Sequence, residues 1–428
     1  MKDIPYWIDT APAFPDRSGR QLPDSVDVAI VGGGITGLNA AIRLARKGAA
    51  VVVLEQGRFG SGASGRNGGM CTTGVAVGAN AAIDRYGAAA ARGYHDAYLQ
   101  AVDFVEQLVR AERIECDFRR AGRLGVASRP SHHEHQKAAQ TLLAEQFHHE
   151  TVLIGPSELQ AELGSAHYCG ALLDPLSAGL HVGRYVRGLV EVADRSGANL
   201  QEATRVTRVR QRRDGRFDVS ASRGSVSATQ VLLATDAYTD GAFPGLRRRM
   251  VTVGSFIIVT EPLGDRLARE VMPRGRMVVD TRNVSHYFRL TPDNRLLFGG
   301  RARFALSNPD SDRKSGRILH RDMLRVFPQL ARAHIDYVWG GNVGISFDRM
   351  PHAGQMGGLY YSMGYSGHGV QMASLMGARI AEVMDGHPEA NPWRHLKARM
   401  FPTYSGTAWF LPLVGAYFRL KDWVGAAH

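Results

Sequence analysis

The stretch VDVAIVGGGITG, residues 26–37, decides the fold of this chain. An apolar, β-branched segment runs directly into a G-x-G-x-x-G pattern, and residues 38–47 continue as a helix that Gly48 ends. Residues 50–54 are a second apolar strand, which ends at Glu55. A strand, a glycine turn, a helix and a second strand form a βαβ unit, so the sequence predicts an α/β fold that begins with a dinucleotide-binding unit.

The glycines of this unit have separate roles. Gly32 permits the tight turn, Gly34 lets the backbone approach a pyrophosphate, and Gly37 lets the helix pack against the strand. The helix N-terminus then stabilises the phosphate charge. Glu55 lies 18 residues past Gly37, where a carboxylate can accept hydrogen bonds from an adenosine ribose. We therefore expect the cofactor to contact Gly32, Gly34, Ile35, Thr36, Gly37, Glu55 and Gln56.

A second glycine-rich loop, residues 57–69, favours FAD over NAD. Its glycines, serines, arginine and asparagine suit a loop that wraps a pyrophosphate and the edge of a flavin. An NAD domain normally continues directly into further βα units, and an NAD dehydrogenase leaves this loop without a role. The residues that we expect to contact FAD here are Ala63, Ser64, Arg66, Asn67, Gly68 and Gly69.

Two later segments complete the cofactor site. Residues 230–238 are a buried strand that ends in a small-residue turn, and residues 364–369 are a glycine loop that enters an apolar helix. The helix N-terminus can stabilise negative charge at the flavin edge. His368 is either a packing or capping residue or a general base that contacts the substrate. With Val206, from the segment 202–209, the expected cofactor contacts are Ala234, Thr235, Tyr365, Gly367, His368, Gly369 and Val370.

The composition narrows the class of protein. The 428 residues carry a net charge of +12, and the basic residues are dispersed, so we expect an anionic substrate and no nucleic acid. The three cysteines match no metal or redox spacing, which predicts no metal site and a cytoplasmic protein in a reducing compartment. The apolar run 408–418 contains Pro412 and is too short to span a bilayer, so we expect no stable membrane insertion.

Taken together, the motifs resemble the D-amino-acid oxidase (DAO) superfamily of FAD enzymes, in the glycine-oxidase and sarcosine-oxidase-like group. Within that group the chain is similar to gamma-glutamylputrescine oxidase and its relatives. The resemblance rests on Tyr6-Trp7, the loop 62–69, the hairpin 287–300 and the loop 364–369. It implies a Rossmann-like FAD-binding domain of the glutathione-reductase type and a second α+β substrate domain built on an antiparallel sheet.

The same resemblance suggests how the chain divides. The FAD-binding domain is expected to be discontinuous and to comprise residues 1–85, 174–245 and 340–390. Residues 86–173 and 246–339 then form the substrate domain, and residues 391–428 form a C-terminal helical tail.

The activity that the resemblance implies is oxidation of the C–N bond of an amine or amino acid, with a gamma-glutamylated amine as one candidate. A hydride passes to flavin N5, the imine hydrolyses, and molecular oxygen reoxidises the flavin. No cysteine follows Cys169 at the position where sarcosine-oxidase relatives attach their flavin, so we expect non-covalent FAD. Those relatives also carry an oxygen-activating lysine where this chain reads RLLFG, residues 295–299.

Three other functions remain open at this stage. Because that lysine is missing, the enzyme can be a dehydrogenase that passes electrons to a quinone or an electron-transfer protein, although we favour an oxidase. An NAD-dependent dehydrogenase is the second alternative. The third is not an enzyme but a basic FAD-containing scaffold or nucleic-acid-associated protein.

The substrate residues are sought on the strand 286–290. Alternate side chains of a strand share a face, so Tyr287 and Arg289 are expected to point toward the flavin together. Arg289 can pair with a substrate carboxylate through two hydrogen bonds. The alternative places Arg289 in solvent and Tyr287 in the core. Arg301 is a second candidate for the anion, and no residue is nominated as a catalytic acid or base.

Overall fold

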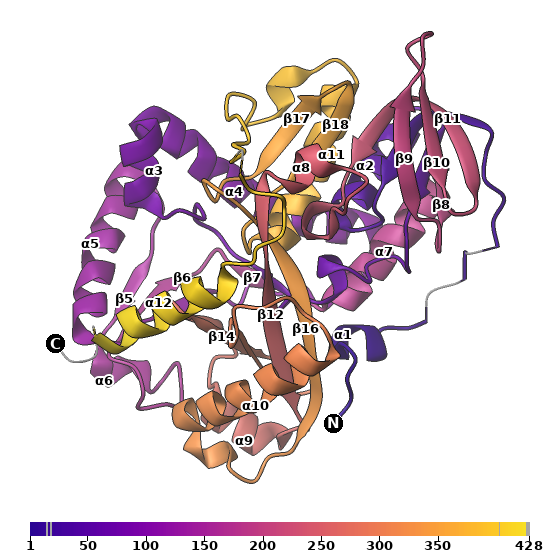
Figure 1. The fold of residues 1–428 in the computed structure, drawn as a ribbon. Coiled ribbons are helices and arrows are strands. Elements are labelled where there is room, and N and C mark those ends of the chain that lie inside the picture. Colours follow the sequence, from indigo (N-terminus) through magenta and orange to yellow (C-terminus); the bar gives the residue numbers. More distant parts are fainter. Residues whose placement is uncertain (14–15, 18, 402, 425–428) are drawn as a thin grey trace.

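The βαβ unit predicted from residues 26–55 is present in a computed structural model, which describes residues 1–13, 16–17, 19–401 and 403–424 (Figure 1). Strand β1 (Ser25–Val31) leads through the glycine turn into helix α2 (Ile35–Arg46), and β2 (Val51–Leu54) pairs with β1 in parallel. Gly37 has no room for a side chain, because a Cβ there lies 2.1 Å from the carbonyl oxygen of Gly32. The missing side chain thus lets α2 begin directly against the turn.

Most neighbouring strands of the first large sheet run parallel to one another. Helices α2, α7 (Val182–Arg195) and α11 (Gly369–Met384) share one apolar core on one side of it, and β9 and β10 pack in another core with β1, β2 and β11. The strand order is β17 (His352–Met356), β18 (Leu359–Met363), β11 (Gly224–Leu233), β1, β2 and β8 (Asn199–Gln201), with β10 (Phe217–Ala221) on β11 and β9 (Val206–Gln211) on β10.

The second large sheet is mainly antiparallel, as expected for a substrate domain. Helices α9 (Gly264–Val271) and α10 (Pro309–Val326) lie together beside this sheet (Figure 1), and their apolar side chains share a core with Phe288 and Phe298. Because side chains alternate along a strand, Tyr287 faces away from that core. The order is β16 (Ile335–Ser346), β12 (Met250–Thr260), β15 (Leu296–Gly300), β14 (His286–Leu290), β13 (Met277–Asp280), β4 (Arg123–Val126), β6 (Ala171–Asp174) and β5 (Val152–Ile154).

The α/β fold with a second, antiparallel sheet is confirmed, whereas the exact division into domains stays a prediction. Helix α4 (Ala88–Glu112), which we expected in the substrate domain, packs against α11 and shares the apolar core of α2. Strand β16 starts before residue 340 and pairs with β12 over its length. In the expected tail, α12 (Leu411–Val424) is helical, and residues 402 and 425–428 lie outside the described residues.

The remaining α-helices and strands lie outside the two large sheets. They are α1 (Tyr6–Asp9), α3 (Ala79–Tyr86), α5 (Pro130–Phe147), α6 (Pro156–Leu159), α8 (Pro244–Arg247), β3 (Met70–Cys71) and β7 (Ala178–Gly179).

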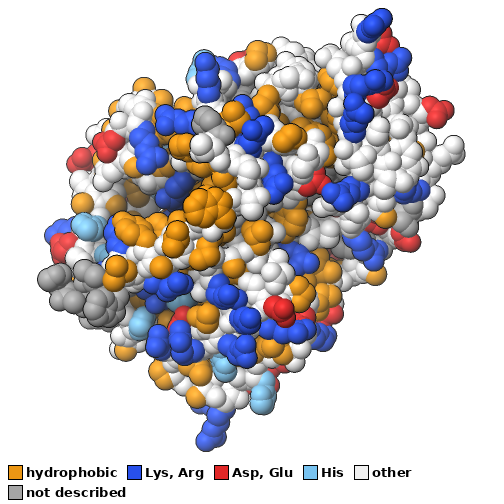
Figure 2. Space-filling view, viewed as in Figure 1, with side chains coloured by type: hydrophobic (Ala, Val, Ile, Leu, Met, Phe, Trp, Pro, Cys, Tyr) orange, Lys and Arg blue, Asp and Glu red, His pale blue; other side chains and the backbone are white. Residues whose placement is uncertain are grey.

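Two features of the structure bear on whether the protein binds a membrane or nucleic acid. No helix among the described residues combines the length and the apolar character that crossing a bilayer requires. On the face in Figure 2, Lys and Arg side chains are scattered among apolar and neutral atoms. This dispersal agrees with the pattern of charges along the sequence.

We expect Gly37→Ala to destabilise the protein by about 1–3 kcal/mol, because the added methyl group has to push α2 away from the turn. Urea denaturation measures this loss of free energy of unfolding. Gly93→Ala is the matched control, since Gly93 lies in α4 with nothing within 4 Å of the added Cβ. That substitution should stabilise by about 0.5–1 kcal/mol, as alanine does in a helix. Equal effects of the two substitutions would contradict the close packing at Gly37.

Candidate functional site: a long cavity between the sheets

One cavity of about 500 Å³ is lined by residues from both large sheets. On the side of the first sheet its wall includes Glu55 and Gln56 after β2, and on the side of the antiparallel sheet it includes Tyr287 of β14 and Arg301, which follows β15. The N-termini of α2 and α11 both reach it, through Gly34 to Thr36 and through Gly369 and Val370. Helix N-termini carry unsatisfied N–H groups and partial positive charge, so the cavity is suited to an anionic ligand.

The structure brings nearly all of the predicted cofactor residues to this cavity. Within the G-x-G-x-x-G pattern, which we call the fingerprint, Gly37 is the exception because it packs against the turn. The predicted residues that line the cavity are Gly32, Gly34, Ile35, Thr36, Glu55, Gln56, Ala63, Ser64, Arg66, Asn67, Gly68, Val206, Ala234, Thr235, Tyr365, Gly367, His368, Gly369 and Val370.

Glu55 is fixed at the end of β2 by the backbone. Its two carboxylate oxygens accept hydrogen bonds from the amides of Gly33 and Gly57, both at 2.8 Å. Burial raises its pKa, and the two backbone donors partly offset that rise. The carboxylate is therefore held toward the cavity and keeps lone pairs for further donors.

Arg289 does not enter the cavity, contrary to our expectation. Its guanidinium donates to the carbonyl oxygens of Gly69 (2.6 Å) and Leu180 (3.2 Å) and lies 5.9 Å from the ring centre of Trp7. Gly69 lies behind the cavity wall with it and does not line the cavity either. Two residues along an extended strand cover about 6.6 Å, which takes Arg289 past the edge of the cavity that Tyr287 still reaches.

The glycine-rich loop 57–69, called the cofactor loop from here on, is held from outside by three side chains. The indole N–H of Trp7 donates to the carbonyl of Asn67 (2.7 Å), and that of Trp339 donates to the carbonyl of Arg66 (2.9 Å). Arg289 holds the carbonyl of Gly69. Inside the loop, the Asn67 side chain donates to the carbonyls of Ala63 and Ser64 and accepts from the amide of Gly69. These contacts fix the loop against the N-terminal helix and the antiparallel sheet.

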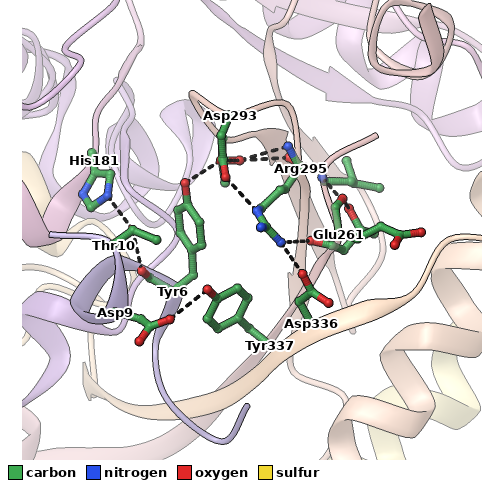
Figure 3. Close-up of polar contacts among 12 residues, drawn as sticks. Tyr6, Asp9, Thr10, His181, Glu261, Asp293, Arg295, Asp336 and Tyr337 are labelled. Carbon is green, nitrogen blue, oxygen red and sulfur yellow. Dashed lines mark hydrogen bonds and ion pairs between the residues drawn. The ribbon is translucent and has the colours of Figure 1, made fainter. Parts of the chain in front are cut away.

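The N-terminal helix that carries Trp7 is itself anchored by a polar network (Figure 3). The phenol of Tyr6 donates to Asp293 in the β14–β15 turn, and Tyr337 of β16 donates to Asp9 (2.8 Å). Arg295 pairs with Asp293 (2.7 Å) and Asp336 (2.6 Å) in the same network. Arg295 is thus committed outside the cavity, and no described cavity-lining residue is a lysine.

The part of the cavity next to the antiparallel sheet has a polar wall. We call this part the chamber and define it by Arg123, Ser255, Tyr287, Arg301, Arg349 and His368. The phenol oxygen of Tyr287 lies 3.0 Å from Ser255 Oγ, and burial raises the pKa of Tyr287 to about 12, so it stays protonated at neutral pH. Arg301, Arg349 and Arg123 also line the cavity. We expected Arg301 as a second candidate, whereas Arg349 and Arg123 carried no signal in the sequence because each lies far from the motifs along the chain.

His368 lies at the N-terminus of α11 and lines the same chamber. Burial, and after it the charges of Arg123 and Arg349, lower its pKa to about 4. The imidazole is therefore uncharged at neutral pH. Its Nδ1 is buried and has no hydrogen-bond partner among the described residues.

Asp236 is a cavity residue that sequence reasoning missed. Its carboxylate accepts from the amide of Gly364 (2.7 Å), and its backbone has a positive φ of 38°. Burial raises its pKa to about 6. Its position directly after the small-residue turn 234–235, which we expected to contact the cofactor, could have identified it from the sequence. Asp236 ties the end of β18 to the turn after β11.

The family model for FAD-dependent oxidoreductases named DAO matches residues 27–383. The chain belongs to this family. It is 33% identical to gamma-glutamylputrescine oxidoreductase of Escherichia coli (strain K12), in an alignment that covers 98% of each chain. Its fold is similar to glycine oxidase from Geobacillus kaustophilus, with a TM-score of 0.72, 19% identity, and 84% of this chain and 95% of that chain covered. L-proline dehydrogenase from P. horikoshii gives a TM-score of 0.71, with 21% identity, 87% of this chain and 98% of that chain covered.

The residues present fit the FAD of this DAO-family oxidoreductase. A Cβ at Gly34 would lie 2.7 Å from Ser64 Oγ, and one at Gly32 would lie 2.7 Å from the carbonyl oxygen of Ala234. Bare backbone therefore borders the cavity where a pyrophosphate needs close approach. The N-terminus of α2 supplies donors for phosphate oxygens, and Glu55 supplies an acceptor for ribose hydroxyls.

Trp7→Phe should weaken FAD binding by about fivefold to tenfold, because the carbonyl of Asn67 loses a hydrogen bond worth about 1 kcal/mol. The measurement is the dissociation constant of FAD from the apoprotein. Trp393→Phe is the control, since Trp393 is fully buried but its indole N–H has no partner in the described structure. If both variants lose the same affinity, the loop contact has no specific role in binding FAD.

Replacing Asp236 with Asn should change how stability depends on pH. The folded carboxyl, with a pKa of about 6, keeps a proton that the unfolded chain releases near 3.8. The wild-type free energy of unfolding therefore loses a contribution as pH rises from about 4 to 6. The asparagine side chain does not titrate, so this decrease is absent from the variant. As pH rises from about 4 to 6, the free energy of unfolding of Asp236→Asn should therefore increase relative to that of the wild type. Urea denaturation from pH 4 to 7 at fixed FAD concentration tests this, and parallel pH profiles would contradict it.

Proposed function

We propose that this protein uses non-covalently bound FAD to oxidise the C–N bond of a small, negatively charged amine or amino acid. The observation that supports this most directly is the single cavity in which the cofactor fingerprint and the chamber of Tyr287 and Arg301 meet. The fingerprint end suits a dinucleotide, and the chamber end offers a phenol and guanidinium groups to a small polar molecule. A dinucleotide and a small polar molecule bound at these places would share one cavity.

The relatives support the choice of an amine substrate. Gamma-glutamylputrescine oxidoreductase, glycine oxidase and L-proline dehydrogenase are all named for substrates that contain an amine or amino-acid nitrogen. Non-covalent binding is supported by the cysteines, because none of the described residues that line the cavity is a cysteine. Cys71 and Cys116 lie in the buried core instead.

Bound FAD supplies the two-electron acceptor for this oxidation. The substrate carbon next to nitrogen gives up a hydride equivalent and the nitrogen gives up a proton, so that a C=N bond forms. Water then adds to the imine and releases a carbonyl compound and an amine. For this chain's residues the task is orientation: Arg301 attracts an anionic group of the substrate, and the neutral Tyr287–Ser255 pair offers hydrogen bonds beside it.

We propose oxygen as the electron acceptor, with a quinone or an electron-transfer protein as the second candidate. The second candidate is favoured by the absence of lysine among the described residues of the cavity wall. Sarcosine-oxidase relatives use a lysine to activate oxygen, and Arg295 at the related strand is held by two carboxylates outside the cavity. Formation of hydrogen peroxide during turnover distinguishes the two acceptors.

The test follows the flavin absorbance of the purified holoenzyme without oxygen as single amines are added. Gamma-glutamylputrescine, sarcosine, glycine and iminodiacetate form the panel, with the matching carboxylic acids as non-oxidisable controls. Rapid loss of the oxidised flavin band with at least one amine, reversed by air with peroxide formation, is the expected result. Reduction that persists in air but reverses with a soluble quinone identifies a dehydrogenase. If no amine reduces the flavin, the proposed function is wrong.

A further inference from the structure

We propose that the chamber selects amines that carry two carboxylate groups, one paired with Arg301 and the other with Arg349. This inference rests on the amine oxidation proposed above and specifies its substrate class. It follows from the distribution of charge along the cavity wall.

The acidic side chains of the cavity wall are already satisfied. Glu55 accepts from two backbone amides, Asp236 accepts from Gly364, and Asp240 pairs with Arg205 at 2.6 Å. Arg205 lines the cavity as well and is thereby neutralised within the protein. None of these three carboxylates forms an ion pair with the arginines of the chamber.

Arg301 and Arg349 are, by contrast, without a hydrogen-bond or ion-pair partner among the described residues. Arg301 is half-buried and Arg349 is exposed, so both guanidiniums are accessible to a small molecule in the chamber. The two are close enough that, after burial, the charge of Arg349 is the next cause that lowers the pKa of Arg301. Guanidinium groups keep their charge at neutral pH, so two like charges lie close together in the chamber wall.

Arg123 adds further positive charge to the same place. It lines the cavity, and its Nε is buried without a partner among the residues described. Burial raises the pKa of the nearby Asp174, but the contact with His149 and the charge of Arg123 lower that pKa overall, and no ion pair joins the side chains of Arg123 and Asp174. The Asp174 carboxylate accepts instead from the amide of Leu176 (2.9 Å) and from Thr73 and Ser177, and it lies 3.4 Å from His149. His368 stays neutral beside these groups. A single carboxylate therefore leaves at least one guanidinium of the chamber unpaired, and a cationic group would be repelled.

The backbone of Arg349 points to a role for its side chain. Arg349 has a φ of +62°, in the left-handed region that glycine adopts without strain. Its amide closes the turn after β16 by donating to the carbonyl of Ser346 (2.9 Å). An arginine at such a position is kept at a conformational cost, and strained residues gather at binding sites.

Because Arg349 has a backbone conformation that glycine adopts without strain, its charge can be removed by a substitution to glycine that should not destabilise the fold. Arg349→Gly deletes the guanidinium and relieves the backbone. Binding of glutarate and butyrate to the holoenzyme is measured by calorimetry. The two acids are the carbon analogues of iminodiacetate and sarcosine, and they differ from each other by one carboxylate.

In the wild type, glutarate should bind at least about tenfold more tightly than butyrate, the effect of one charged hydrogen-bonded pair. Arg349→Gly should abolish most of this preference, change butyrate binding by less than about threefold, and leave the melting temperature equal or higher. Arg210→Gln is the control for a lost positive charge, because Arg210 is 66% exposed on β9 and pairs with Asp218. It should bind glutarate like the wild type.

Equal affinities for glutarate and butyrate in the wild type would overturn the inference, as would an unchanged preference in Arg349→Gly. The turnover experiment separates this outcome from failure of the proposed function. If sarcosine and iminodiacetate reduce the flavin equally well at equal concentrations, oxidation stands and the dicarboxylate inference is wrong. If glutarate binds as expected and no amine reduces the flavin, the anion site stands and the oxidation is wrong.

Discussion

The cavity depends on three hydrogen bonds that hold the cofactor loop by its carbonyl oxygens. Trp7, Trp339 and Arg289 come from the N-terminal helix, β16 and β14, and they hold the carbonyls of Asn67, Arg66 and Gly69. A loop of small residues has many accessible conformations, so it needs such external restraints to present one wall to a ligand. The donors come from the N-terminal helix and the antiparallel sheet while the loop follows β2, so the same bonds also join the two halves of the site.

The cavity is divided electrostatically along its length. At the dinucleotide end the carboxylates are satisfied by backbone amides or by Arg205, and the helix N-terminus of α2 provides partial positive charge. In the chamber, Arg301 and Arg349 have no hydrogen-bond or ion-pair partner among the residues that the structure describes, and His368 is neutral. A ligand at the dinucleotide part meets polar side chains that already have partners. A ligand in the chamber can pair with guanidinium groups that have none among the described residues. This difference is the physical basis for expecting recognition of an anion in the chamber.

Strand β14 illustrates how far a periodic pattern can be used. Alternation correctly predicts that Tyr287 and Arg289 share the face opposite Phe288, and Tyr287 does line the cavity. Arg289 instead reaches the back of the cofactor loop, where the carbonyls of Gly69 and Leu180 accept hydrogen bonds from its guanidinium. The period of a strand determines which face of the sheet each side chain lies on. It does not determine which other segment of the chain packs against that side chain. For Arg289, that segment lies more than a hundred residues away in the sequence.

The sequence by itself determined the βαβ unit, the glycine positions, the loop 57–69 and many of the residues that line the cavity. These features are local: a tight turn, a helix start and a close backbone approach each demand particular residue types at fixed spacing. Only the tertiary structure decided which arginines line the chamber, because Arg123, Arg301 and Arg349 come from three separate segments. It also revealed that Asp236 holds Gly364 and that Arg295 is paired elsewhere. Charges are placed by packing between distant segments, and no local spacing records that arrangement.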